Sequence, residues 1–106
     1  MRTYVSTRGG QTIEGSAGAI IQGIAEDKGL FVPQEIPTLP LDIGKLEAMS
    51  YREVAEIIIG AFFDDFTEEE IKSCVRGAYD SKFPEEVVPI VEAGDAWFME
   101  LYHGKT

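Results

Sequence analysis

Two helix-capping motifs in the middle of the chain constrain the fold more than any other feature of the sequence. Ser50 is followed three positions later by Glu53, and Thr67 by Glu70. In such a capping box the hydroxyl caps a helix start and the carboxylate returns a hydrogen bond to the cap. Apolar residues then recur at helical spacing, first as Val54, Ile57, Ile58, Ala61 and Phe62, then as Ile71, Val75, Ala78 and Tyr79. We therefore expect two amphipathic helices, the second ending before Pro84.

The beginning of the chain combines strand signals with a third helix. Residues 2–7 are rich in β-branched and aromatic side chains, and Gly9-Gly10 suits a two-residue hairpin turn. Ser16 is expected to cap a helix, and Gly29 stands where a left-handed C-terminal cap would end it. The apolar face of this helix comprises Ala17, Ile20, Ile21 and Ile24. Residues 30–32 predict a short strand that stops at Pro33.

The remainder of the chain adds a proline-rich loop and a last strand. Three prolines in residues 33–41 favour an extended loop, and a short helical turn is expected near residues 42–49. Residues 96–103 alternate as a strand does, but carry large apolar side chains on both faces, which is typical of a strand between two covering layers. The sequence therefore predicts an α+β fold, with about three amphipathic helices packed on a small β-sheet or hairpin. We expect part of residues 96–106 to be exposed, disordered, or covered by a crystal or oligomer partner.

Length and charge limit the function classes. The chain has 106 residues and a net charge of −10, which disfavours nucleic acid and anionic membranes as partners. It shows no secretory signal, and the apolar run at residues 57–63 is far too short to span a bilayer. With its single cysteine, Cys74, it is expected to be cytoplasmic. Most enzymes that enclose an organic cofactor need a longer chain. We therefore expect the protein either to have a function that needs no such enclosure or to be part of a larger protein.

Acidic residues are concentrated between Asp64 and Glu70, where five of them occur. A calcium loop would need alternating oxygen ligands and a central glycine, which this segment lacks. We interpret the segment as a capped, solvated helix start, whose carboxylates suit the positive end of the helix dipole.

Three kinds of catalytic or binding site can be weighed from residue types. Gly104-Lys105-Thr106 resembles the end of a P-loop, but the position for the first glycine holds Met99. Cys74 and His103 would make a nucleophile and base only with a third, orienting group, and a buried structural cysteine is the favoured interpretation. A metal site at His103 would need further His or Cys ligands, and the chain has one of each.

Several segments together resemble the N-terminal region of the threonine synthase family. Residues 4–9, Tyr-Val-Ser-Thr-Arg-Gly, are similar to its opening Tyr-x-Ser-Thr-Arg-Gly. Residues 19–33 are similar to the longer motif Ala-Ile-x-x-Gly-Leu-Ala-x-Asp-Gly-Gly-Leu-Phe-Val-Pro, with Lys28 in place of a glycine. Ser50-Tyr51 with Ala55 resembles the next helix. Residues 100–106 resemble Glu-Leu-Phe-His-Gly-Pro-Thr, with Lys105 in place of proline.

The resemblance implies a parent enzyme that converts O-phospho-L-homoserine and water into L-threonine and phosphate with pyridoxal phosphate. In the family, the lysine that forms the Schiff base follows shortly after the His-Gly-x-Thr element, so this chain is expected to stop before it and to be inactive alone. Residues 1–83 would form the N-terminal domain, able to fold alone. Residues 84–106 would connect it to the cofactor-binding domains of the same polypeptide, its implied partners.

The resemblance also implies candidate site residues, none of which would take part in the catalytic reaction. His103, Gly104 and Thr106 would lie at the edge of the active site, either as substrate contacts or as a structural histidine and a backbone turn. Ser6, Thr7 and Arg8 either bind an anionic substrate group or, as we favour, anchor the N-terminal strand to the remainder of the protein. No catalytic residue, cofactor-binding residue or metal ligand is expected in the chain. The alternative function is a free-standing acidic interaction module that binds a basic protein through residues 64–86.

Overall fold

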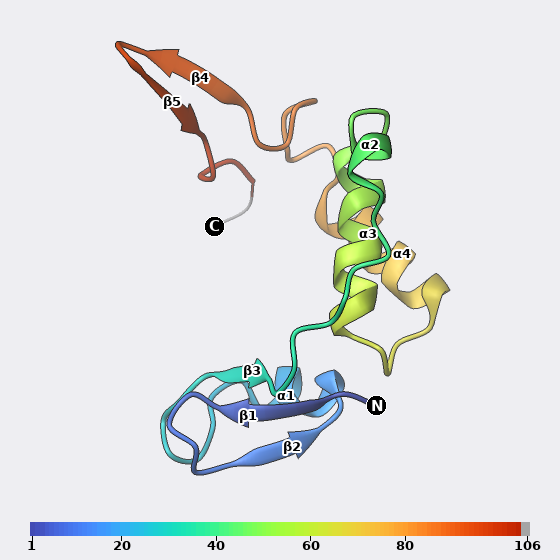
Figure 1. Ribbon diagram of the computed structural model, residues 1–106, viewed down its shortest axis with the longest axis vertical. Coiled ribbons are helices and arrows are strands. Elements are labelled where there is room, and N and C mark those ends of the chain that lie inside the picture. Colours follow the sequence, from blue (N-terminus) through green and yellow to red (C-terminus); the bar gives the residue numbers. More distant parts are fainter. Residues whose placement is uncertain (105–106) are drawn as a thin grey trace.

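The computed structural model describes residues 1–104, which begin with a small sheet covered by one helix (Figure 1). Strands β1 (Thr3–Ser6), β2 (Thr12–Glu14) and β3 (Phe31–Pro33) form an antiparallel sheet in the order β2-β1-β3. Helix α1 (Ser16–Gln22) packs against β1 and β2. Tyr4, Ser6, Ser16, Ala19 and Ala25 form its buried interior. We call residues 1–33 the N-terminal lobe.

The predicted hairpin of the N-terminal lobe is present, but its turn is not the two-residue type. The amide of Ser6 donates to the carbonyl of Gln11, so four residues connect the paired positions. Of the two glycines only Gly9 has a positive φ, 76°. A two-residue turn of the expected type needs positive φ at both central positions, so the conformation of Gly10 excludes that turn type here.

Helix α1 differs from its prediction at both ends and on its apolar face. Gly15, not Ser16, occupies the N-cap position, and the helix ends at Gly23 with φ 76°, well before Gly29. Ser16 is the first helical residue and is buried. The isoleucines expected on the buried face are largely exposed, Ile21 most of all at 87%. The periodicity therefore identified an apolar face correctly, but this face has no cover within the described residues.

The central helices follow the sequence signals closely. After an extended loop, a short helix α2 (Ile43–Leu46) precedes α3 (Tyr51–Phe62) and α4 (Glu68–Ala78). Both capping boxes are complete, with Ser50 and Glu53 at the start of α3 and Thr67 and Glu70 at the start of α4. Ile71 and Val75 of α4 are buried, so the two helices share a small core.

The end of the described chain is a two-stranded hairpin of β4 (Ile90–Ala93) and β5 (Ala96–Met99). The predicted last strand is therefore present but ends at Met99 rather than at residue 103, and its partner strand β4 was not predicted. All residues of both strands are exposed, including Trp97 at 69%. This confirms the expectation that the apolar C-terminal segment has exposed parts.

Asp64 and Asp65 join the N-terminal lobe to the helices, which corrects the interpretation of all five acids as a solvated helix start. Asp65 Oδ1 and Oδ2 accept from the amides of Ser16 and Ala17, each at 2.9 Å, and Oδ1 also accepts from the Ser16 hydroxyl. Asp64 Oδ1 accepts from the amide of Arg2 at 2.9 Å. Only Glu68, Glu69 and Glu70 remain as an exposed first turn of α4.

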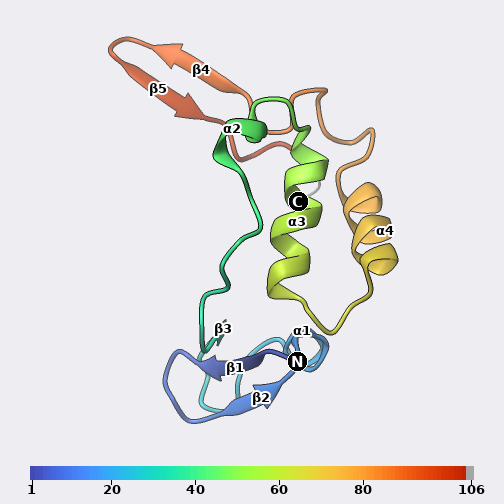
Figure 2. The same cartoon turned by 45° about the vertical axis from the view of Figure 1, so that its right-hand side comes forward.

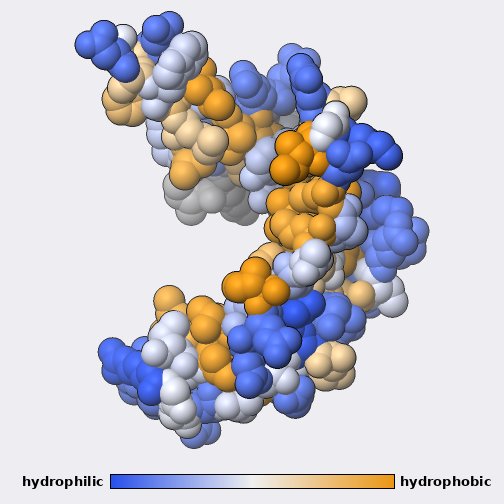
Figure 3. Space-filling model, in the orientation of Figure 1, coloured by the Kyte–Doolittle hydropathy of each residue, from blue (hydrophilic) through white to orange (hydrophobic). Residues whose placement is uncertain are grey.

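The whole molecule is open rather than compact. The N-terminal lobe and the β4–β5 hairpin lie at opposite ends, with α3 and α4 between them (Figures 1 and 2). The radius of gyration is 16.3 Å, against about 13 Å for a compact domain of this length. In the space-filling view, apolar residues border the hollow on several sides (Figure 3). The α+β fold class is confirmed, and within residues 1–104 no helix has the length and apolar character of a membrane span.

Candidate functional site

The polar side chains that follow β5 form a connected cluster. The Tyr102 hydroxyl donates to Glu100 Oε2 at 2.8 Å, and His103 Nε2 lies 3.0 Å from Glu100 Oε1. The Tyr102 and His103 rings are 4.5 Å apart between centroids. The hydrogen bond from His103, and to a smaller extent the one from Tyr102, holds the pKa of Glu100 below its ordinary value. We call Glu100, Tyr102 and His103 the C-terminal cluster.

The turn after His103 is held by the aromatic side chains of the helical region. Gly104 has φ 103°, and a Cβ atom there would lie 2.3 Å from the Phe83 ring, so no larger residue fits. Phe83 in turn contacts Tyr79 at 5.2 Å between ring centroids, and Tyr79 contacts Tyr51 at 5.1 Å. The position of the predicted site residues His103 and Gly104 is thus tied to α3 and α4. Lys105 and Thr106, with the P-loop resemblance, lie outside the described residues.

Ser6, Thr7 and Arg8 surround the turn that carries Asp27. The Ser6 hydroxyl donates to Asp27 Oδ1 at 2.6 Å, and Arg8 Nη1 donates to the Asp27 carbonyl at 3.1 Å. Thr7 Oγ1 accepts from the amide of Leu30 at 3.0 Å. The hydrogen bond from the Ser6 hydroxyl, and to a smaller extent the one from the Gly29 amide, lowers the pKa of Asp27. These residues hold a turn within the N-terminal lobe, while an anionic substrate contact stays a prediction.

Cys74 is exposed, which contradicts the interpretation of a buried structural cysteine. It lies on α4 at the border of an apolar groove of about 220 Å³, beside residues such as Ile59, Phe63 and Tyr79. Cys74 lines this groove together with Ile71 and Val75, but unlike them it is exposed to solvent at the edge of the buried helix face. Among residues 1–104, the hydrogen bond of the His103 ring is to Glu100 and none joins it to Cys74. No group of three metal-binding side chains occurs in this part of the chain.

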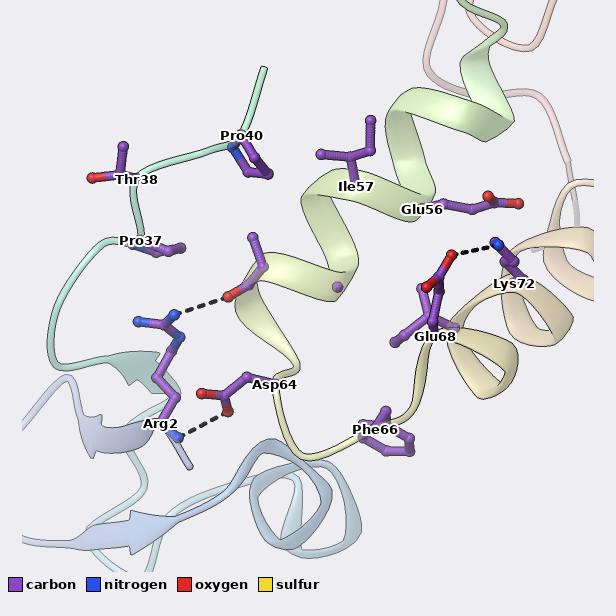
Figure 4. Close-up of a pocket in the computed structure, with 13 residues that line it drawn as sticks. Arg2, Pro37, Thr38, Pro40, Glu56, Ile57, Asp64, Phe66, Glu68 and Lys72 are labelled. Atoms are coloured by element: carbon purple, nitrogen blue, oxygen red, sulfur yellow. Dashed lines mark hydrogen bonds and ion pairs between the residues drawn. The ribbon is translucent and has the colours of Figure 1, made fainter.

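A cavity of about 630 Å³ lies between the proline-rich loop and α3 (Figure 4). Its charged lining residues are largely paired with protein groups. Arg2 donates through Nη2 to the Ala61 carbonyl at 2.9 Å, and Lys72 pairs with Glu68. The cavity was not predicted, because its walls come from segments far apart in the sequence. We find no catalytic arrangement of side chains in it.

Sequence reasoning missed Glu100 and Asp65 as functional or structural partners. Glu100 stands three positions before His103, a spacing that is visible in the sequence. In a turn after a strand, however, this spacing alone does not predict contact. Asp65 contacts residues 48 and 49 positions away, and no local pattern indicates such a pair.

Comparison with known proteins gives a consistent result. The family model described as threonine synthase N terminus matches residues 3–79. The threonine synthase of Schizosaccharomyces pombe is 33% identical, over 98% of this chain and 21% of that protein. Human threonine synthase-like 2 is 32% identical, over 97% of this chain and 22% of that protein. The chain thus spans about a fifth of the length of these relatives.

A solved structure agrees with this in three dimensions. The crystal structure of pyridoxal-phosphate-bound threonine synthase from Brucella melitensis superposes with a TM-score of 0.78 and 31% identity, covering 99% of this chain and 23% of that one. The two structures therefore share a similar fold over nearly the whole of this chain. On the family match and these relatives, the chain belongs to the threonine synthase family and corresponds to its N-terminal region.

Proposed function

We propose that this chain is the N-terminal structural and interface domain of a threonine synthase. The parent enzyme would convert O-phospho-L-homoserine and water into L-threonine and phosphate with pyridoxal phosphate. The observation that carries the proposal is the unburied apolar surface on α1 and on the β4–β5 hairpin, in a chain that spans about a fifth of its relatives. Surface of this kind marks contact sites in proteins.

Two apolar surfaces support the interface role. The first, on α1, exposes Ile20, Ile21 and Ile24 at 54%, 87% and 59%. The second, on the hairpin, exposes Trp97, Phe98 and Met99 at 69%, 53% and 57%. An isolated two-stranded hairpin is at best marginally stable in water. We infer that both surfaces are covered by the cofactor-binding domains of the same polypeptide.

The division into two parts follows from the same argument. Residues 1–83 contain the capped helices and the three-stranded sheet, and we propose that they form the N-terminal domain. Residues 84–106 would be the connecting segment and the first strand of the cofactor-binding domain. Supporting this division, residues 90–99 bury no side chain within the described chain.

The described residues do not fit pyridoxal phosphate. The cavity of about 630 Å³ is lined by Glu56, Asp64 and Glu68, and these carboxylates would repel a phosphate group. Lys72 beside it is paired with Glu68. We therefore place the cofactor and the catalytic lysine in the remaining polypeptide, and derive no chemical step from this chain. His103, Gly104 and Thr106 would border the site, while Ser6, Thr7 and Arg8 would act mainly as an internal anchor. The single, free cysteine supports the proposed cytoplasmic location.

The test begins with the gene downstream of Thr106. An Ala-Phe-Lys-Asp motif within a few codons is expected, and its absence would contradict the parent assignment. The complete polypeptide should then release phosphate from O-phospho-L-homoserine and restore growth of a threonine auxotroph, while residues 1–106 alone should do neither. Binding of a cationic protein by residues 1–106 that weakens with salt would instead support the acidic interaction module.

A further inference from the structure

The C-terminal cluster carries an inference that rests on the proposed function. We propose that Glu100 is a positioning residue for His103: it holds the imidazole by Nε2 and thereby presents Nδ1 as a hydrogen-bond acceptor at the edge of the active site. The acceptor would serve an O–H or N–H group of the substrate, or a water molecule there.

The chemistry of the pair fixes which ring nitrogen carries the proton. Glu100 Oε1 lies 3.0 Å from His103 Nε2. An ionised carboxylate can only accept a hydrogen bond, so Nε2 must donate and the neutral ring keeps its lone pair on Nδ1. Lowering of the Glu100 pKa by its two hydrogen bonds favours this ionised form. Among residues 1–104, we find no hydrogen bond to Nδ1.

The geometry around the pair holds it in place. The second carboxylate oxygen accepts from the Tyr102 hydroxyl at 2.8 Å, so both oxygens of Glu100 are engaged. The Glu100 amide donates to the Pro89 carbonyl at 2.9 Å, which anchors the backbone of Glu100 to the hairpin. Its side chain is 22% exposed and that of His103 27%, so water screens the pair only in part. Gly104, packed on Phe83, fixes the other end of the turn.

The hydrogen bond to Nε2 selects the same ring nitrogen whether the pair is functional or merely structural, so kinetics must distinguish the two roles. Replacing the partner that orients a metal-bound histidine typically lowers affinity or activity by about 10-fold to 100-fold, and we expect an effect of similar size for a partner that orients His103. In contrast, a pair that only stabilises the turn would change the free energy of unfolding when it is lost and leave kcat unchanged, because neither side chain would then act on a reacting group. The two interpretations therefore predict different kinetics for the same substitution.

The experiment uses the complete polypeptide and the substitution Glu100→Gln. We expect kcat to fall about 10-fold or more with a smaller change in KM, while Glu69→Gln, the same change at an exposed position in the first turn of α4, leaves both unchanged. In a His103→Asn background, Glu100→Gln should have no further effect, because Glu100 would act only through His103. Effects that multiply in the double variant would overturn the proposal.

A spectroscopic readout separates this proposal from the proposed function. Nitrogen-15 correlation spectra, with the His103 signals identified by their loss in His103→Asn, should show the proton on Nε2 at a pH where the ring is neutral. Glu100→Gln should convert this signal to a mixture of tautomers. An unchanged tautomer in Glu100→Gln would overturn the positioning role even in an active enzyme. If the wild-type polypeptide released no phosphate, the proposed function would be contradicted. The tautomer measurement would still test whether Glu100 orients His103.

Discussion

At the scale of single residues, Asp65 shows how one carboxylate can join two parts of a chain. It occupies the N-terminal end of α1, where the amides of Ser16 and Ala17 have no partner within the helix. A helix N-terminus also carries partial positive charge, which favours an anion. Asp65 thus supplies the cap that Ser16 was expected to supply, and it does so from the α3–α4 connection.

The pH dependence of stability tests this role. Partial burial raises the pKa of Asp65, but hydrogen bonds from the Ser16 hydroxyl and from the Ala17 and Ser16 amides outweigh it and lower the pKa to about 2 from the ordinary 3.8. Because the folded-state pKa is depressed, the stabilisation is complete above about pH 5 and is lost as the pH falls toward 2. We expect Asp65→Asn to lower the free energy of unfolding by about 1–2 kcal/mol at pH 7.

The measurement is urea unfolding of both proteins at several pH values between 2 and 7. The difference between wild type and Asp65→Asn should shrink as the pH falls, because the protonated carboxyl resembles the amide. Asp95→Asn, in the exposed turn between β4 and β5, serves as control and should change stability by less than about 0.5 kcal/mol. A difference for Asp65→Asn that is the same at every pH would rule out this role.

Prediction from sequence succeeded for residues whose partners are close along the chain. Ser50 with Glu53 and Thr67 with Glu70 form the expected boxes because each pair needs only one turn of helix. The partners of Asp65, Ser16 and Ala17, are far away in the sequence and meet it only in the folded protein. A pattern of residue spacing therefore cannot predict their contact. The same limit applies to Cys74, whose exposure depends on which neighbours cover α4.

At the scale of elements, the cap of α4 should stabilise the helical pair. Thr67 Oγ1 accepts from the Glu70 amide at 3.3 Å, and the Glu70 carboxylate accepts from the Thr67 amide at 2.7 Å. Thr67→Ala removes the hydroxyl and should lower the free energy of unfolding by about 1 kcal/mol. Ser73→Ala, at an exposed position inside the same helix, should change it by less than about 0.5 kcal/mol or slightly raise it. Chemical denaturation followed by circular dichroism compares the two, and equal effects would contradict the capping role.

Prediction of helices and strands from the sequence failed where tertiary packing, and not the local residue pattern, decides which faces are buried and which strands pair. The spacing of Ile20, Ile21 and Ile24 indicates an apolar face, but a pattern cannot say which part of the protein covers it. For β4, the short apolar run at Ile90 and Val91 is interrupted by a charged residue and a glycine turn, so the sequence signal was weak. Its pairing with β5 came from the tertiary arrangement. For the candidate site, the family resemblance pointed to His103, whose place at the edge of the active site stays a prediction, and the contact of His103 with Glu100 was not predicted.

At the scale of the whole molecule, the open shape and the exposed apolar faces have one common explanation. A domain that folds against a larger partner need not enclose its own core on every side. The radius of gyration of 16.3 Å, well above the value of about 13 Å for a compact chain, fits such a domain. The net charge of −10 would keep the isolated chain soluble in spite of its exposed apolar groups.

Ile21 allows the covered state to be distinguished from the open one. In the described chain its side chain is 87% exposed, so Ile21→Gln should change the free energy of unfolding of residues 1–106 by less than about 0.5 kcal/mol. In the complete polypeptide, cofactor-binding domains packed on α1 would bury this side chain, and the same substitution should cost about 2–3 kcal/mol. Ser73→Gln, on the exposed polar side of α4, is the matched control and should have little effect in either form. Thermal and urea unfolding of the four variant proteins give the comparison. Equal, small effects of Ile21→Gln in both forms would mean that α1 stays uncovered, and the proposed docking of this face on the rest of the enzyme would then be wrong.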